Sequence, residues 1–195
     1  MFIETPKASE ASERLFAASA KSMGFVMNLT KAWAWRPDIF DDFAVLRSQL
    51  TSNSTLTKRD QAVIVCATAS ELGDSYCSLA WGKTLAAEAG PAVAAAVISG
   101  TAEQSLAARD RALAGWARKV VADPNGTTPT DIEKMRAIGF TDREIFEATT
   151  FIAFRLAFST VNDALGVQPD WQLAESVDPE VRKAVTFGRQ TLPRP

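Results

Sequence analysis

The chain of 195 residues contains no histidine and only two cysteines. The absence of histidine excludes Ser-His-Asp and Cys-His catalytic arrangements, zinc sites that need histidine ligands, and histidine as a general base. Two cysteines are too few for a four-cysteine metal cluster or a disulfide-rich scaffold. Any chemistry must therefore use a thiol, a carboxylate, Arg, Lys, a hydroxyl group or a bound cofactor.

The sequence also lacks an excess of charge of either sign. It has 21 Lys and Arg against 23 Asp and Glu, a net charge of −2. This balance predicts neither a nucleic-acid partner nor an anionic membrane surface. The glycines are isolated and form no phosphate-binding loop, and no carboxylate cluster suggests a metal. We therefore expect no nucleotide cofactor and no metal.

Long hydrophobic runs are missing as well. The longest weakly polar stretch, 86–99, is interrupted by Glu88, Gly90 and Pro91, and it is too short to span a bilayer. The N-terminus has no basic region followed by an apolar stretch, so it does not resemble a secretory signal. We expect no membrane association and a cytoplasmic location.

What the sequence does contain is typical of helices. Alanine-rich segments lie between glycines and prolines, and several begin with capping residues. The length fits one domain, and no hairpin signal occurs, so we predict an all-α fold. The expected helices cover about 9–23, 25–35, 57–72, 74–88, 91–98, 105–121, 142–165 and 178–190, with another beginning at Pro37 and a short one capped by Thr130 and Glu133.

One short pattern occurs twice. The sequence L-x-x-R-D-x-A begins at Leu56 and again at Leu106. Both copies are expected at helix starts, where acidic residues are favoured by the helix dipole. Seven positions are too few to indicate a duplicated unit.

Cys77 is the most informative position. It follows Asp74, an expected N-cap, and therefore lies in the first turn of a helix, where free N–H groups lower the pKa of a thiol. The negative charge of Asp74 opposes this effect, and on spacing alone a buried inert cysteine is the more common outcome. Cys66 lies in an apolar run and is interpreted as core packing. The spacing does not predict whether the two cysteines form a disulfide.

Five segments, taken in order, resemble a known family. They are similar to the core of the alkylhydroperoxidase D and carboxymuconolactone decarboxylase superfamily, and their wider layout resembles its peroxidase-related branch. The resemblance covers about residues 10–170 and implies an all-helical, homo-oligomeric protein. It implies one such domain over 1–195, with a core at about 10–170 and a C-terminal helix and tail at 171–195. The matching segments are 56–60, 73–81, 106–114, 138–145 and 162–167.

The family's reactive residues are mostly replaced in this chain. Its members reduce peroxides with a Cys-x-x-Cys pair at a helix N-terminus, a histidine one turn later and an upstream glutamate. Cys77 matches the second cysteine, whereas Asp74 stands at the first, Trp81 at the histidine and Ala62 at the glutamate. A two-cysteine disulfide cycle cannot run through this motif, and whether the chain is an enzyme stays open.

Three interpretations remain. Cys77 acts alone as a one-cysteine (alkyl)hydroperoxide reductase in antioxidant defence, restored from its sulfenic acid by an external thiol. Alternatively, the same pocket, with Asp74 and Cys77 facing a cavity walled by Trp81, binds a small molecule or hosts non-redox chemistry such as a decarboxylation. In the third, the site is vestigial and the protein is a structural oligomer, with Asp74 a helix cap and Trp81 core. The expected ligand is a peroxide or an organic acid.

Arg155 is a further candidate for the pocket. It lies within the apolar run 151–158, and a buried guanidinium needs an anionic partner. Glu147 and Asp163 lie too far along the same helix to be direct local partners. The partner is therefore expected from another helix or chain, or it is the carboxylate of a substrate.

Overall fold

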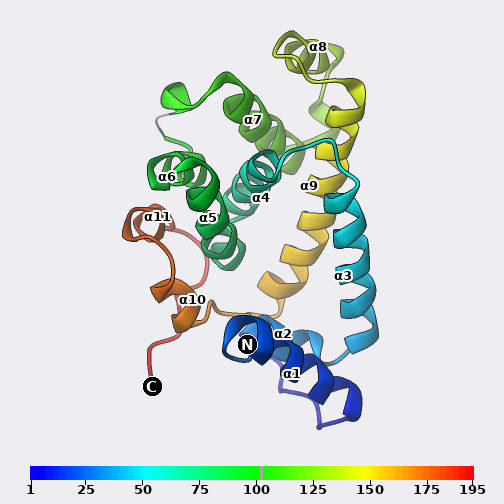
Figure 1. Cartoon of the computed structure of the whole chain (residues 1–195), viewed down its shortest axis with the longest axis vertical. Coiled ribbons are helices and arrows are strands. Elements are labelled where there is room, and N and C mark those ends of the chain that lie inside the picture. The colour runs from blue at the N-terminus through cyan, green and yellow to red at the C-terminus, as the bar shows by residue number, and fades with distance from the viewer. Residues whose placement is uncertain (102) are drawn as a thin grey trace.

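The computed structural model describes residues 1–101 and 103–195, and every regular element within them is a helix. The all-α prediction is therefore confirmed (Figure 1). The helices are α1 (Glu10–Met23), α2 (Asn28–Trp33), α3 (Pro37–Ser52), α4 (Lys58–Leu72), α5 (Ser75–Ala89), α6 (Pro91–Ser99), η1 (Glu103–Ser105), α7 (Ala108–Ala122), η2 (Pro124–Gly126), α8 (Pro129–Ala137), α9 (Asp142–Ala164), α10 (Trp171–Glu175) and α11 (Pro179–Ala184).

Helix α4 forms the centre of the molecule. Its residues from Asp60 to Ala69 are all buried, because the helix is apolar on nearly every side and packs against α5, α6, α7 and α9. In Figure 1, α5 and α6 lie to the left of α4, α7 lies above it and the long α9 lies to its right. The β-branched run Val63–Val65 is helical, so its composition reflects complete burial.

Most helix starts follow the local capping signals. Thr57 with Asp60 and Thr141 with Glu144 form the predicted capping boxes of α4 and α9, and Asp74 caps α5. The prediction for α8 was wrong by two residues. Thr128 caps it together with Asp131, because Pro129 lacks an N–H and is favoured in the first helical position.

The expectations for two other segments need correction. Helix α7 begins at Ala108, after the separate turn η1, and the expected start near 105 was too early. The C-terminal helix ends at Ala184 and does not reach 190, and the short α10 was not predicted. Beyond α11 the chain is held by other elements: Ser75 Oγ donates to the carbonyl oxygen of Arg189 at 2.7 Å.

The repeated L-x-x-R-D pattern has a structural explanation. The two copies exchange ion pairs: Arg59 binds Asp110, and Arg109 binds Asp60 with an Nε–Oδ1 distance of 2.8 Å. Arg109 also binds Glu144 of α9 at 2.7 Å. Asp60 and Asp110 are each only 2% exposed. These crossed pairs fix the beginning of α4 against the beginnings of α7 and α9.

The N-terminal helices α1 and α2 lie at the lower end of α9, and α3 runs upward alongside it (Figure 1). Trp33 of α2 stacks on Phe158 of α9 with ring centroids 5.2 Å apart, and Phe40 and Phe43 of α3 pack around both rings. This aromatic cluster joins the N-terminal helices to α9, and two of its members, Phe40 and Phe158, also line the cavity of the candidate site. Among the described helices, none has the length and apolar character needed to cross a bilayer.

Candidate functional site

The first turn of α5 positions Cys77. Gly73 ends α4 with a φ of 82°, which brings Asp74 to the N-cap of the next helix. Asp74 Oδ1 accepts a hydrogen bond from the backbone N–H of Cys77 at 2.9 Å. Its other oxygen, Oδ2, is buried and has no hydrogen-bond partner among the described residues. Cys77 therefore lies directly beside a buried carboxylate.

Helix α9 approaches the same thiol from the other side. Arg155 Nη2 donates to Cys77 Sγ at 2.9 Å, and Ser159, one turn further along α9, donates to it at 3.6 Å. The Arg155 guanidinium lies 5.6 Å from the centre of the Trp81 ring and 5.2 Å from that of Phe158. The structure thus brings Cys77, Trp81 and Arg155 together.

The partner of Arg155 differs from the expected carboxylate. Arg155 is 5% exposed, and no carboxylate within the described part of the chain forms an ion pair with it. Glu147 pairs with Arg143 instead. The sulfur of Cys77 accepts one hydrogen bond from the guanidinium, while Nε of Arg155 is buried and has no partner among the residues that the structure describes.

A cavity of about 560 Å³ opens beside this group. Its walls come from α1, α2, α3, α5, α9 and α10, and Cys77, Trp81 and Arg155 line it. Asp74 is completely buried behind Cys77 and does not line the cavity. A molecule in the cavity therefore reaches the thiol directly and the Asp74 carboxylate only through it.

The resting thiol keeps its proton. Burial and the charge of Asp74 raise the pKa of Cys77 to about 12, although the positive charge of Arg155 lowers it. Burial also raises the pKa of the Cys66 thiol, which is 0% exposed. Both cysteines are free, and only Cys77 lines the cavity.

Arg47 of α3 is a cavity residue that the sequence reasoning missed. The residue as a whole is solvent-exposed, and it lines the same cavity. Partial burial of its guanidinium, together with the nearby charge of Arg155, lowers the pKa of Arg47. A signal was present, because Arg47 interrupts the apolar stripe formed by Phe40, Phe43 and Leu50 at helical spacing. Ser159 was also missed, and nothing in its local sequence distinguishes it.

Asp170 ties the elements around the cavity together. This buried carboxylate accepts hydrogen bonds from the hydroxyl of Tyr76 and, at 3.1 Å, from the backbone N–H of Asn28. Burial raises the pKa of Asp170 despite these hydrogen bonds. Three segments distant in sequence, at the starts of α2, α5 and α10, therefore meet at one side chain.

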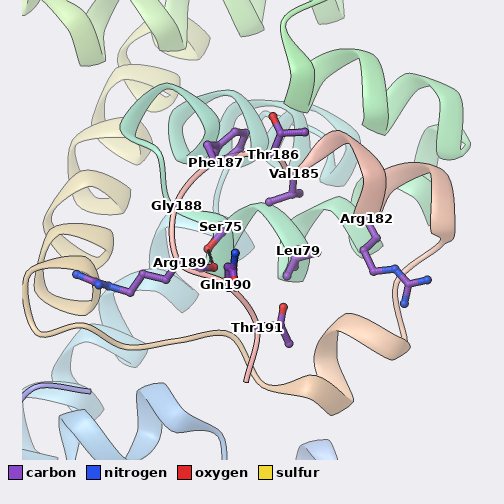
Figure 2. Close-up of a pocket in the computed structure, with 10 residues that line it drawn as sticks. All are labelled: Ser75, Leu79, Arg182, Val185, Thr186, Phe187, Gly188, Arg189, Gln190 and Thr191. Carbon is purple, nitrogen blue, oxygen red and sulfur yellow. Dashed lines mark hydrogen bonds between the residues drawn. The ribbon is translucent and has the colours of Figure 1, made fainter. Parts of the chain in front are cut away.

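A second cavity, of about 320 Å³, lies against α5 beneath the C-terminal segment. Figure 2 shows this segment passing beside Ser75, with Leu79 on the opposite side of the cavity and Arg189 directed away toward α9. Gly188 has a φ of 71°, and a Cβ there would collide with the carbonyl oxygen of Gly73. The segment thus braces the start of α5.

In the described residues no group of three or more Cys, Asp or Glu side chains is placed to hold a metal.

Comparisons with known proteins identify the fold. A scan of protein-family models finds no match, and neither does a search of curated proteins. Among solved structures, an uncharacterized peroxidase-related protein from Silicibacter sp. is 22% identical, with a TM-score of 0.78 over 88% of this chain and 93% of that one. An alkylhydroperoxidase AhpD core from Ralstonia eutropha, also described as peroxidase-related, is 24% identical, with a TM-score of 0.77 over 96% and 97%.

A third neighbour has a different activity. The debrominase Bmp8 is 15% identical, with a TM-score of 0.70 over 88% of this chain and 92% of that one. One of its structures is a cysteine-to-alanine variant in complex with 2,3,4-tribromopyrrole. Together these similarities show that the chain has the alkylhydroperoxidase D-like fold, as the sequence resemblance predicted.

Proposed function

We propose that this protein is a one-cysteine thiol peroxidase that reduces organic hydroperoxides, with Cys77 as the reacting residue. The observation that carries the proposal is the 2.9 Å contact between Arg155 Nη2 and Cys77 Sγ at the wall of the cavity. A guanidinium in this place stabilises a thiolate and the negative charge that develops on a leaving oxygen. The peroxidase-related descriptions of two structural neighbours support the same class of reaction.

The proposed cycle balances with an external thiol as reductant. The Cys77 sulfur attacks the terminal oxygen of ROOH, the O–O bond breaks, and an S–O bond forms, giving a sulfenic acid. The departing alkoxide takes up the proton that the thiol released and leaves as ROH. One external thiol then forms a mixed disulfide with Cys77 and releases water. A second external thiol restores Cys77 and leaves as the disulfide.

Asp74 is proposed as the proton acceptor for Cys77. With a pKa of about 12 the thiol is protonated at neutral pH, yet only the thiolate attacks efficiently. The family's histidine and glutamate are absent, whereas the Asp74 carboxylate lies against Cys77 and has one oxygen without a partner. Trp81 and Arg155 are proposed to contact the substrate, since both line the cavity next to the thiol.

The first test is direct detection of the sulfenic acid. On treatment with cumene hydroperoxide, Cys77 is expected to be labelled by a dione reagent specific for sulfenic acids, as read by peptide mass spectrometry. Cys66, which is 0% exposed, is the internal control and is expected to stay unlabelled. No labelling of Cys77 in the folded protein would contradict the proposal and favour the vestigial site. Labelling that appears only after the protein is unfolded, and then equally on both cysteines, would contradict it in the same way.

The pH dependence of the Asp74→Asn variant tests the proton acceptor. Asparagine preserves the N-cap, so the helix start is retained. If Asp74 takes the proton, the variant oxidises about 10²-fold more slowly near pH 7, and its rate rises about tenfold per pH unit because free thiolate must form first. If Asp74 acts only through its charge, the variant has a lower thiol pKa and reacts faster than the wild type. Stopped-flow measurement of Cys77 oxidation between about pH 6 and pH 8 distinguishes the two signs.

A second candidate function is binding or different chemistry in the same cavity. The observation that favours it is the debrominase, which shares the fold and has a substrate that is not a peroxide. Failure of Cys77 to react with any hydroperoxide, together with binding of a small molecule in the cavity, would favour this candidate.

The proposed setting is a single-domain homo-oligomer in the cytoplasm. Exposed apolar side chains on α3 and α9, Val45 at 57% and Phe146 at 71%, support association of subunits. Two free cysteines suit a reducing compartment, which also supplies the external thiol.

A further inference from the structure

We infer that the cavity beside Cys77 binds an amphipathic monocarboxylate, whose carboxylate lies between Arg47 and Arg155 and whose apolar part lies against α1 and α2. This inference rests on the proposed function in one respect, because it names the class of hydroperoxide that would be reduced: one that carries a carboxylate. The binding itself needs no reaction and is tested without one.

The charges around the cavity carry the first step. Arg47, Lys83 and Arg155 line it from α3, α5 and α9, and no Asp or Glu is among its described lining residues. Neither Arg47 nor Arg155 forms an ion pair with a described carboxylate. Arg47 and Arg155 also both line a smaller cavity between α3 and α9, so the two side chains face the same space. Burial and, to a smaller extent, the charge of Arg155 lower the pKa of Arg47. Two like charges at one cavity are stabilised by an anion bound there.

The burial of Arg155 gives a second indication. The residue is only 5% exposed, its Nε has no partner in the described part of the protein, and the Cys77 sulfur is the acceptor of its Nη2. A guanidinium charge without an ion-pair partner is unfavourable at such a position, and a carboxylate beside its accessible part compensates the charge best. Arg47 is exposed and lines the same cavity, so an anion can approach it from solvent.

The remaining walls favour a ligand that is larger and more apolar than a small inorganic anion. Leu15 and Met23 of α1, Met27 and Leu29 near α2, and the rings of Phe40 and Phe158 line the same cavity. Its volume, about 560 Å³, lies in the usual range for sites that enclose small organic molecules. A ligand with one charged end and an apolar body fills both regions.

Calorimetric titration with octanoate, and with octan-1-ol as the neutral analogue of equal length, tests the inference. Octanoate is expected to bind at least about tenfold more tightly than octan-1-ol, because a charge-assisted hydrogen bond is worth that much or more. Arg47→Met is expected to reduce this difference several-fold while leaving octan-1-ol binding unaffected, since Arg155 still contacts the carboxylate, and Arg47→Lys is expected to reduce it less. Arg14→Met, an exposed arginine of α1 that does not line the cavity, is the matched control and is expected to bind octanoate like the wild type.

The outcomes separate this inference from the proposed peroxidase activity. Equal binding of octanoate and octan-1-ol, no binding of octanoate, or unchanged octanoate binding by Arg47→Met would overturn the carboxylate site. Octanoate binding that is retained by the Cys77→Ser variant supports the site independently of the thiol chemistry. If the protein binds octanoate through Arg47 but forms no sulfenic acid, the carboxylate site is supported and the peroxidase proposal is contradicted.

Discussion

Replacing Cys77 by serine is expected to abolish turnover of organic hydroperoxides. Cys77 is the only cysteine that lines the described cavity, and the sequence has Asp74 where the resemblance described above would place a resolving cysteine. Serine retains the size and the helix position of the side chain, but its hydroxyl does not form a stable counterpart of the sulfenic acid. Loss of the nucleophilic sulfur is therefore expected to abolish the reaction completely, where loss of a supporting residue would only slow it. Peroxide consumption, followed with a small-molecule thiol as reductant, measures the effect.

Cys66→Ala provides the matched control for this prediction. Cys66 is completely buried and is not a lining residue of the cavity, so its removal deletes one buried sulfur atom without altering the proposed chemistry. Turnover by Cys66→Ala is expected to match the wild type after correction for the folded fraction. Undiminished peroxide consumption by Cys77→Ser would show that another group reacts and would end the one-cysteine proposal.

Replacing Arg109 by methionine is expected to lower the free energy of unfolding by about 3 kcal/mol. Arg109 binds both Asp60 and Glu144, and Asp60 is 2% exposed. Methionine preserves much of the packing of the arginine stem but leaves the Asp60 charge buried without its partner. Chemical denaturation at neutral pH measures the loss. The exposed pair Arg136–Asp142 supplies the control, and Arg136→Met is expected to change stability by less than about 1 kcal/mol.

The same variant has a predictable pH dependence. In the wild type, hydrogen bonds from Arg109 and Thr57 lower the pKa of Asp60 against the opposing effect of burial. A depressed carboxyl pKa contributes stability above the pKa of the unfolded chain and loses it as the pH falls. The deficit of Arg109→Met is therefore expected to be largest at neutral pH and to shrink toward about pH 3. Adding Asp60→Asn to Arg109→Met should recover stability, because the unpaired buried charge is then removed. A loss of stability in Arg109→Met no larger than that in Arg136→Met would contradict the role assigned to the buried Asp60 ion pair.

Local signals in the sequence predicted much of the fold. The caps at Thr57, Asp74 and Thr141 act within a single helical turn, so their residues can be recognised without knowledge of the rest of the molecule. The C-terminal segment was not predicted, because its conformation depends on Ser75 and on the close approach of Gly188 to Gly73. Contacts of this kind join residues that are far apart in sequence.

The candidate site was predictable only in part for the same reason. Cys77 and Asp74 share one helix turn, and Arg155 was recognisable as a charge within an apolar run. The hydrogen bond between Arg155 and Cys77 joins α9 to α5, and the choice of sulfur in place of a carboxylate follows from how these helices pack. Arg47 acquires its significance only because α3 lies beside the same cavity.

The position of Asp170 has a consequence for the biosynthesis of the protein. Its carboxylate is bound by the backbone of Asn28, 142 residues earlier in the chain, and by Tyr76. During translation the helices that carry Cys77 and the N-terminal wall of its cavity leave the ribosome well before Asp170 does. Until that residue emerges, the thiol lies in an incomplete pocket. The candidate site is therefore completed only after Asp170 is synthesised, and a shorter nascent chain is expected to expose a cysteine that the folded structure encloses.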